Sequence, residues 1–207
     1  MMADRGNLYV IAAPSGTGKT TLVKALVDSL PKITVSISHT TRPKRPNEMH
    51  GINYYFIDKT EFERMIEQQD FLEFASIFDH YYGTSKRTVE ETLAKGIDVI
   101  LEIDWQGHQQ IKHLFPDSIG IFILPPSMQD LQNRLIKRNQ DDKIMIKRRL
   151  ADAKEAVSHA QEFDYLLIND DFAKALHDLK IIVEACYFLQ NRQLVKQTTL
   201  IASFKNM

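Results

Sequence analysis

Residues 13–20 read Ala13-Pro14-Ser15-Gly16-Thr17-Gly18-Lys19-Thr20, between an apolar run at 8–12 and a helical pattern that begins at Thr21. A strand, a glycine-containing loop and a helix in this order are typical of a phosphate-binding loop, whose backbone N–H groups point at phosphate oxygens beside the positive end of the helix. Lys19 is expected to reach the β- and γ-phosphates of a nucleoside triphosphate, and the Thr20 hydroxyl to ligate Mg²⁺. The first glycine of the usual pattern is Ala13 here. Because alanine is the smallest replacement, we expect the turn to survive. The alternative is a glycine-rich turn that merely precedes a helix.

The composition indicates one domain with small insertions. The chain has 207 residues, 43% of them hydrophobic, which is enough for a sizeable core. A net charge of −1 provides no global positive field, so duplex nucleic acid is excluded as the main partner. The single Cys186 excludes an internal disulfide and fits a reducing compartment. No uncharged run has membrane-spanning length, and Asp4 and Arg5 interrupt any apolar N-terminal stretch, so we expect a cytoplasmic protein without a membrane partner.

Apolar runs that alternate with helical patterns indicate an α/β fold. Besides residues 8–12, strands are expected at 33–37, 98–104, 119–124 and 164–168. The alternation predicts a mostly parallel sheet with helices on both faces, a three-layer core. A C-terminal helix carries an apolar stripe made of Ala175, Leu179, Ile182, Cys186 and Leu189. The stripe predicts that Cys186 fills the core and is not a nucleophile.

Residues 38–88 break this alternation and are predicted to form an inserted subdomain. The segment contains a basic, proline-containing loop at 42–47 and a short strand at 53–57. Thr60 and Glu63 have the spacing of a capping box, which predicts a helix that starts there. A second insertion is expected in the charged region around 134–149, as a solvated helix pair or a mobile lid.

Arg42 and Arg45 lie three residues apart on a loop stiffened by proline. Two guanidinium groups at this spacing can clamp one dianionic phosphate with charge-assisted hydrogen bonds. Tyr54 and Tyr82 can donate a hydroxyl to that phosphate or stack on a base. Gly83, beside Tyr82, permits close approach of a ligand to the backbone. The alternatives are a solvated basic loop or a nucleic-acid patch for the arginines, and ordinary packing for the tyrosines.

Glu73 is a carboxylate within the apolar run Phe71-Leu72-Glu73-Phe74. A carboxylate accepts hydrogen bonds and donates none, and guanine presents two adjacent donors on its pairing edge. Adenine presents an acceptor at N1, and such a mismatch in a buried site discriminates by up to roughly 10⁴-fold. Glu73 is therefore predicted to select guanine. The alternative is a surface glutamate on a helix.

Glu102 and Asp104 end the predicted strand at 98–104, and alternation places them on one side of it. Ligands of open α/β sheets bind outside the carboxyl ends of the strands. Both residues are candidates to organise Mg²⁺ through water or to meet the acceptor base. The alternative is that Asp104 caps the next helix.

The chain resembles the guanylate kinase family over essentially its whole length. The motifs that carry the resemblance are residues 13–19, Ser38-His39-Thr40-Thr41-Arg42, Tyr81-Tyr82-Gly83-Thr84-Ser85, Ile103-Asp104-Trp105-Gln106-Gly107 and Ile168-Asn169-Asp170-Asp171. The resemblance implies the reaction ATP + GMP ⇌ ADP + GDP with Mg²⁺, and dGMP as a further acceptor. It implies a core at 1–37, 89–130 and 155–207, a GMP-binding subdomain at 38–88 and a lid at 131–154. It is compatible with a monomer or a homo-oligomer.

The family's functional residues fall on matching positions of this sequence. The expected GMP contacts are Ser38, Arg42, Arg45, Tyr54, Glu73, Tyr82, Gly83, Thr84 and Asp104. The expected ATP contacts are residues 13–21 (Ala13, Pro14, Ser15, Gly16, Thr17, Gly18, Lys19, Thr20 and Thr21), Arg134 and Asn169. The expected catalytic residues are Lys19, Arg42, Arg138 and Arg149. The family's Arg-Gly-Arg-Gly stretch reads Ile136-Lys137-Arg138-Asn139 here, which keeps one arginine and loses both glycines.

Two other functions fit parts of this pattern. A catalytically silent module that binds protein partners shares the fold, but such modules tend to lose the loop lysine, whereas Lys19 and Thr20 are present here. A related kinase that acts on another nucleotide or a sugar phosphate is the second alternative, against which Glu73 and the arginine pair argue.

Overall fold

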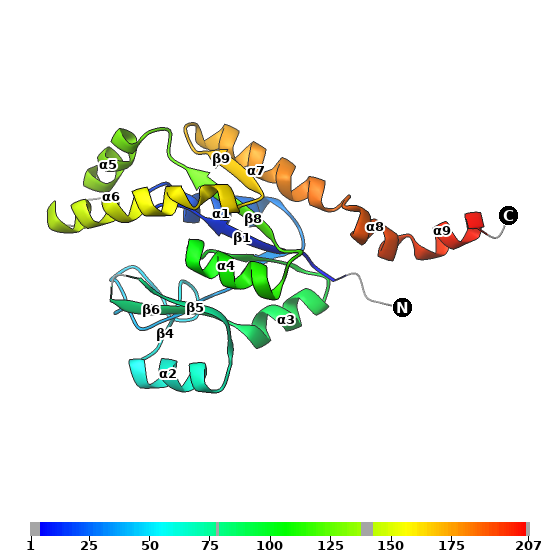
Figure 1. Cartoon of the computed structure of the whole chain (residues 1–207), viewed down its shortest axis with the longest axis horizontal. Coiled ribbons are helices and arrows are strands. Elements are labelled where there is room, and N and C mark those ends of the chain that lie inside the picture. The colour runs from blue at the N-terminus through cyan, green and yellow to red at the C-terminus, as the bar shows by residue number, and fades with distance from the viewer. Residues whose placement is uncertain (1–4, 78, 138–142, 206–207) are drawn as a thin grey trace.

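The core of the computed structural model is a five-stranded parallel sheet (Figure 1), and the structure describes residues 5–77, 79–137 and 143–205. The strand order is β2-β7-β1-β8-β9. The strands are β1 (Leu8–Ala12), β2 (Ile33–Val35), β7 (Asp98–Leu101), β8 (Ile119–Leu124) and β9 (Tyr165–Ile168). The predicted α/β fold class is confirmed. The predicted strand at 98–104 is too long, because the ladder ends at Leu101 and the next three residues lead into a helix.

Helices cover both faces of this sheet. The side chains of β1 alternate between two cores, since Tyr9 and Ile11 face one side while Leu8 and Val10 face the other. On the first side lie α1 (Lys19–Ser29) and α7 (Phe172–Cys186), and on the second lie α3 (Lys86–Ala94) and α4 (Trp105–Leu114). Cys186 is buried in the first core, as its helical spacing predicts.

A second, four-stranded sheet lies below the core in Figure 1, with strand order β4-β3-β6-β5. Its elements are β3 (His39–Thr40), β4 (Tyr55–Phe56), β5 (Phe71–Ile77), β6 (His80–Ser85) and the helix α2 (Lys59–Glu67). The predicted capping box at Thr60 is wrong. The helix begins two residues after Ile57, and its N-cap is Asp58, whose carboxylate accepts from the Glu61 N–H at 2.8 Å.

Two helices, α5 (Met128–Lys137) and α6 (Lys143–Ser158), pack against each other through Leu131, Leu135 and Ala153. The 3₁₀ turn η1 (Ala160–Glu162) follows α6. The chain ends in α8 (Gln190–Lys196) and α9 (Thr198–Lys205), which extend away from the core (Figure 1). Within the described residues, no helix is both long and apolar enough to cross a bilayer.

Candidate active site

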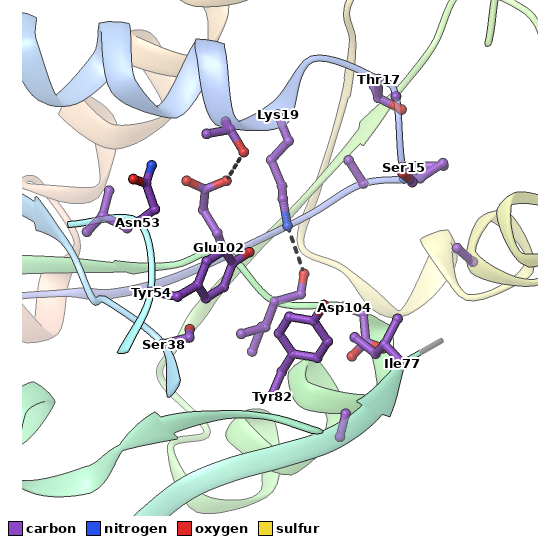
Figure 2. Close-up of a pocket in the computed structure, with 18 of the residues that line it drawn as sticks. Ser15, Thr17, Lys19, Ser38, Asn53, Tyr54, Ile77, Tyr82, Glu102 and Asp104 are labelled. Carbon is purple, nitrogen blue, oxygen red and sulfur yellow. Dashed lines mark hydrogen bonds between the residues drawn. The ribbon is translucent and has the colours of Figure 1, made fainter. Parts of the chain in front are cut away.

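A cleft of about 1040 Å³ lies between the phosphate-binding loop, the end of β7, the four-stranded sheet and α6 (Figure 2). Most of the residues predicted to bind a nucleotide line it. They are residues 13–21, Ser38, Arg42, Arg45, Tyr54, Glu73, Tyr82, Glu102, Asp104 and Arg149. Segments far apart in the sequence are thus brought to one cavity.

The loop at 13–18 curls through two glycines in left-handed backbone conformations. Gly16 and Gly18 both have φ of +99°. Ala13 is not among the described non-glycine residues with positive φ, so its methyl group introduces no backbone strain. The Thr17 N–H donates to the Pro14 carbonyl at 3.2 Å, which closes the turn. Since α1 has no side-chain cap, its first N–H groups are left for an anion.

Lys19 crosses the cleft toward the end of β7, as Figure 2 shows, and donates to the Ile103 carbonyl at 3.3 Å. Desolvation lowers the pKa of the Lys19 ammonium, and the nearby carboxylates of Glu102, Asp104 and Glu73 oppose that shift. A phosphate placed here would supply the negative charge that this half-buried cation needs.

The Thr20 hydroxyl donates to Glu102 Oε2 at 2.9 Å (Figure 2). A hydroxyl and a carboxylate are the hard oxygen donors that Mg²⁺ prefers, and they lie beside the loop that would hold the phosphates. The residues present therefore fit the ion.

Asn169 and Arg134 do not line the cleft but hold the phosphate-binding loop from behind. The Asn169 amide donates to the Thr17 carbonyl at 2.7 Å, and Arg134 donates to the same carbonyl at 3.0 Å. Arg134 also donates to the Asn169 carbonyl at 2.9 Å. Both side chains, predicted as nucleotide contacts, here fix the conformation of the loop.

Arg149 of α6 donates to the Ser15 hydroxyl at 3.0 Å, so a guanidinium already lies against the loop. Its neighbour Arg148 pairs with Asp79, at the turn between β5 and β6, at 3.1 Å. Arg138, the other arginine predicted on this segment, lies outside the described residues.

The basic loop is organised by Glu48, a residue that the sequence reasoning missed. Its carboxylate accepts from Arg42 at 2.7 Å and from the Arg45 N–H at 2.9 Å. The Arg42 guanidinium lies 5.5 Å from the centre of the Tyr54 ring. Its pKa is raised, because the contacts with Glu48 outweigh desolvation. The signal that could have found Glu48 is an acid three residues after Arg45.

Glu73 lies in β5 and its side chain is buried, with a residue exposure of 3%. Its Oε1 accepts from the Thr84 hydroxyl at 2.5 Å. Burial raises the pKa of Glu73 to about 7, against the opposing effect of the Thr84 hydrogen bond. The alternative of a surface glutamate on a helix is wrong, because the strand turns this side chain inward.

Three further predicted residues have roles within the fold. Gly83 does not line the cleft, since a Cβ there would lie 2.9 Å from the Phe71 ring and 3.0 Å from Phe62. Thr84 is fully buried and bonds Glu73. Asp104 caps α4, as its Oδ1 accepts from the Gly107 N–H at 3.0 Å, and its side chain also lines the cleft.

Comparison with known proteins agrees with this geometry. A model of the guanylate kinase family matches residues 5–186. A guanylate kinase of Alcanivorax borkumensis is 54% identical over 97% of this chain and 97% of its own length, and one of Methylococcus capsulatus is 52% identical over 96% and 97%. The crystal structure of the guanylate kinase of Anaplasma phagocytophilum superposes with a TM-score of 0.78 at 30% identity, covering 93% of this chain and 92% of that one. The chain belongs to the guanylate kinase family.

Proposed function

We propose that the cleft binds ATP on the phosphate-binding loop and GMP on the four-stranded sheet, with the two phosphates meeting near Lys19. The reaction is that of the family: ATP phosphorylates GMP to GDP, with Mg²⁺. What the proposal adds is the role of each side chain.

The identification of GMP as the substrate that accepts the phosphoryl group rests on the burial of Glu73. It is a buried carboxylate in the same cleft as the phosphate-binding loop, and it offers only acceptors once ionised. The N1–H and the 2-amino group of guanine would satisfy both oxygens, whereas adenine would leave one oxygen against a lone pair. Asp104, at the start of α4, is proposed to accept from the same base.

The phosphate of GMP is proposed to bind Arg42, Arg45, Tyr54, Tyr82 and Ser38. All five residues line the cleft. When Arg42 binds the phosphate, its contact with Glu48 must weaken or be shared. Glu48 therefore holds the guanidinium in place while the site is empty of substrate.

Transfer of the phosphoryl group needs little acid–base chemistry, because the phosphate oxygen of GMP is already a nucleophile. The protein contributes positioning and neutralisation of the charge on the moving group. Lys19, Arg42 and Arg149 are proposed to supply that positive charge, together with Arg138. When bound, Mg²⁺ neutralises phosphate oxygens, and Thr20, with Glu102 and Asp104 acting through water, would hold it.

We further propose that residues 38–88 act as a GMP-binding subdomain and residues 131–154 as a lid, on a core made of 1–37, 89–130 and 155–207. Closure of both segments would exclude water and suppress hydrolysis of ATP. We also propose dGMP as an acceptor and the cytoplasm as the compartment, which fits the single buried cysteine.

A panel of acceptors tests the assignment of the site. Wild type and Glu73→Gln are assayed with Mg²⁺ and ATP against GMP, dGMP, IMP and AMP, by coupled detection of ADP. Wild type should prefer GMP over AMP by roughly 10³-fold or more. In Glu73→Gln an amide donor faces the donors of guanine, so the preference should collapse. A variant that keeps the wild-type preference would remove Glu73 from base selection.

A further inference from the structure

The side chain of Gln110, on α4, pairs with a peptide group of β5. The Phe74 N–H donates to Gln110 Oε1 at 3.2 Å, and Gln110 Nε2 donates to the Phe74 carbonyl at 2.9 Å. β5 is an edge strand of the four-stranded sheet, so within the described part of the chain these two backbone groups have no further strand to pair with. One side-chain amide therefore takes the place of the peptide of a neighbouring strand.

Phe74 directly follows Glu73, at an irregular place in the ladder. Phe71 pairs with Ser85 and Glu73 with Thr84, so the register of β5 against β6 shifts between Phe71 and Glu73. A β-bulge of this kind changes the direction in which the following side chains point. The direction of the Glu73 side chain thus depends on where the regular ladder resumes, and Gln110 binds the residue next to it.

The same helix face also touches the Glu73 carboxylate. Gly107 lies three residues before Gln110, hence on the same side of α4. A Cβ on Gly107 would lie 2.7 Å from Glu73 Oε2, so only glycine lets the helix come this close. α4 and β5 run side by side in Figure 1. The helix therefore contacts both the carboxylate and the strand that carries it.

We propose that Gln110 is a positioning residue for guanine selection. Through its two hydrogen bonds to Phe74 it fixes the backbone of β5 at the bulge and so holds the Glu73 carboxylate where guanine is read. Gln110 itself touches neither the base nor a phosphate. The inference rests on the proposed role of Glu73 in the site.

A merely structural tether would have different consequences. If Gln110 only joined α4 to the sheet, its loss would lower the free energy of unfolding and would affect all substrates equally. If it positions Glu73, its loss weakens GMP binding, leaves ATP binding intact and reduces discrimination between bases that differ at the pairing edge.

The experiment compares Gln110→Ala with Gln109→Ala. Gln109 is the adjacent residue of the same type, and its amide donates to Glu162 on the core, at 2.8 Å. We expect Gln110→Ala to raise the KM for GMP about tenfold, with the KM for ATP unchanged. The preference for GMP over IMP, which lacks the 2-amino group, should fall by a similar factor. Gln109→Ala should match wild type in all three quantities.

The dependence of the KM for GMP on pH is a further test, because the loss of a merely structural tether would not change its midpoint. The groups that act on the Glu73 carboxylate are Thr84 from β6, Asp104 from the start of α4 and Lys19 from α1. In wild type, the KM for GMP should fall as the pH rises through about 7, where Glu73 ionises. In Gln110→Ala the carboxylate becomes more hydrated, so that midpoint should move to lower pH.

Gln110→Glu keeps an acceptor for the Phe74 N–H but loses the donor for its carbonyl. It should raise the KM for GMP and lower the GMP-to-IMP ratio, as the alanine variant does, but its negative charge near Glu73 disfavours ionisation of that carboxyl and should move the pH midpoint up. It replaces the alanine variant if that variant folds poorly. The inference is overturned if both variants keep the wild-type KM for GMP, GMP-to-IMP ratio and pH midpoint. The proposed role of Glu73 fails separately, if Glu73→Gln keeps its preference for GMP whatever the Gln110 variants do.

Discussion

Arg148 of α6 pairs with Asp79, at the turn between β5 and β6, with 3.1 Å between Nη1 and Oδ2. The pair joins the proposed lid to the proposed GMP-binding subdomain. Asp79 has a φ of +66°, a left-handed conformation that aspartate and asparagine tolerate better than most residues. The two inserted segments therefore touch each other directly as well as through the nucleotides they would hold.

Asp79→Asn removes the charge of this pair and keeps a side chain suited to the turn. Because the pair links both segments, the KM values for ATP and for GMP should rise together, by at most about fivefold for such an exposed pair. The difference from wild type should shrink as salt is added, since salt screens exposed charges. Glu91→Gln breaks the exposed Arg87–Glu91 pair of α3 and is the control. Unchanged KM values at low salt would rule out coupling through this pair.

Lys19→Ala should lower kcat by about 10³-fold, because it removes a cation placed to stabilise charge in the transition state. GMP binding should stay within a few-fold of wild type, since Lys19 is not among the proposed contacts of GMP. Steady-state kinetics and calorimetric titration with GMP measure the two effects. Lys174→Ala, an exposed lysine of α7 that does not line the cleft, is the control. Wild-type turnover in Lys19→Ala would remove the phosphate-binding loop from the mechanism.

Glu73 makes the stability of the protein depend on pH. Folding raises its pKa from an ordinary value of 4.5 to about 7, so the folded state favours the protonated acid. The contribution of protonated Glu73 to the free energy of unfolding is therefore fully present below about pH 4.5, and it is lost as the pH rises through about 7.

The side chain at position 73 cannot ionise in Glu73→Gln. The free energy of unfolding of this variant should therefore not show the fall with rising pH that Glu73 causes in wild type. From pH 5 to pH 8 the variant should gain about 2.5 kcal/mol relative to wild type. Urea unfolding at several pH values measures the difference. Parallel curves for the two proteins would show that Glu73 does not titrate in this range.

Asn169→Ala removes a buried donor to the Thr17 carbonyl. The loop should lose part of its fixed conformation, so the KM for ATP should rise about tenfold while the KM for GMP stays constant. The free energy of unfolding should fall by about 1–2 kcal/mol, because a buried hydrogen bond is broken. Asp170→Asn, at the exposed next residue, should leave both KM values unchanged. An unaltered KM for ATP in Asn169→Ala would show that Arg134 alone holds the loop.

The parallel sheet could be predicted because strands buried on both faces leave continuous apolar runs. The runs at 8–12, 119–124 and 164–168 match β1, β8 and β9 within one residue. The strand predicted at 98–104 is too long, because Glu102-Ile103-Asp104 continues an alternating pattern after the ladder has ended. In the structure Asp104 caps α4, a role that periodicity does not distinguish from the end of a strand.

The cleft residues could be predicted from local motifs, whereas the contacts that hold them could not. Glu48 near Arg42, Gln110 on Phe74 and Asn169 behind Thr17 each depend on how separate segments pack. The strand β5 was not predicted from the sequence, because the buried carboxylate of Glu73 interrupts its apolar pattern. Asn169 was predicted to contact ATP, and in the structure its side chain binds the Thr17 carbonyl of the phosphate-binding loop.

Ala13 has a consequence for recognising relatives of this chain. The backbone at position 13 accepts a methyl group. Gly16 and Gly18, in contrast, both have a φ of +99°. A Cβ added to Gly16 would lie 2.9 Å from Leu135, and one added to Gly18 would lie 2.7 Å from Asn169. Replacement of glycine by alanine is therefore tolerated at position 13, whereas it would strain the loop at positions 16 and 18. A sequence pattern that requires glycine at position 13 would discard this enzyme, and one that requires only Gly16 and Gly18 would retain it.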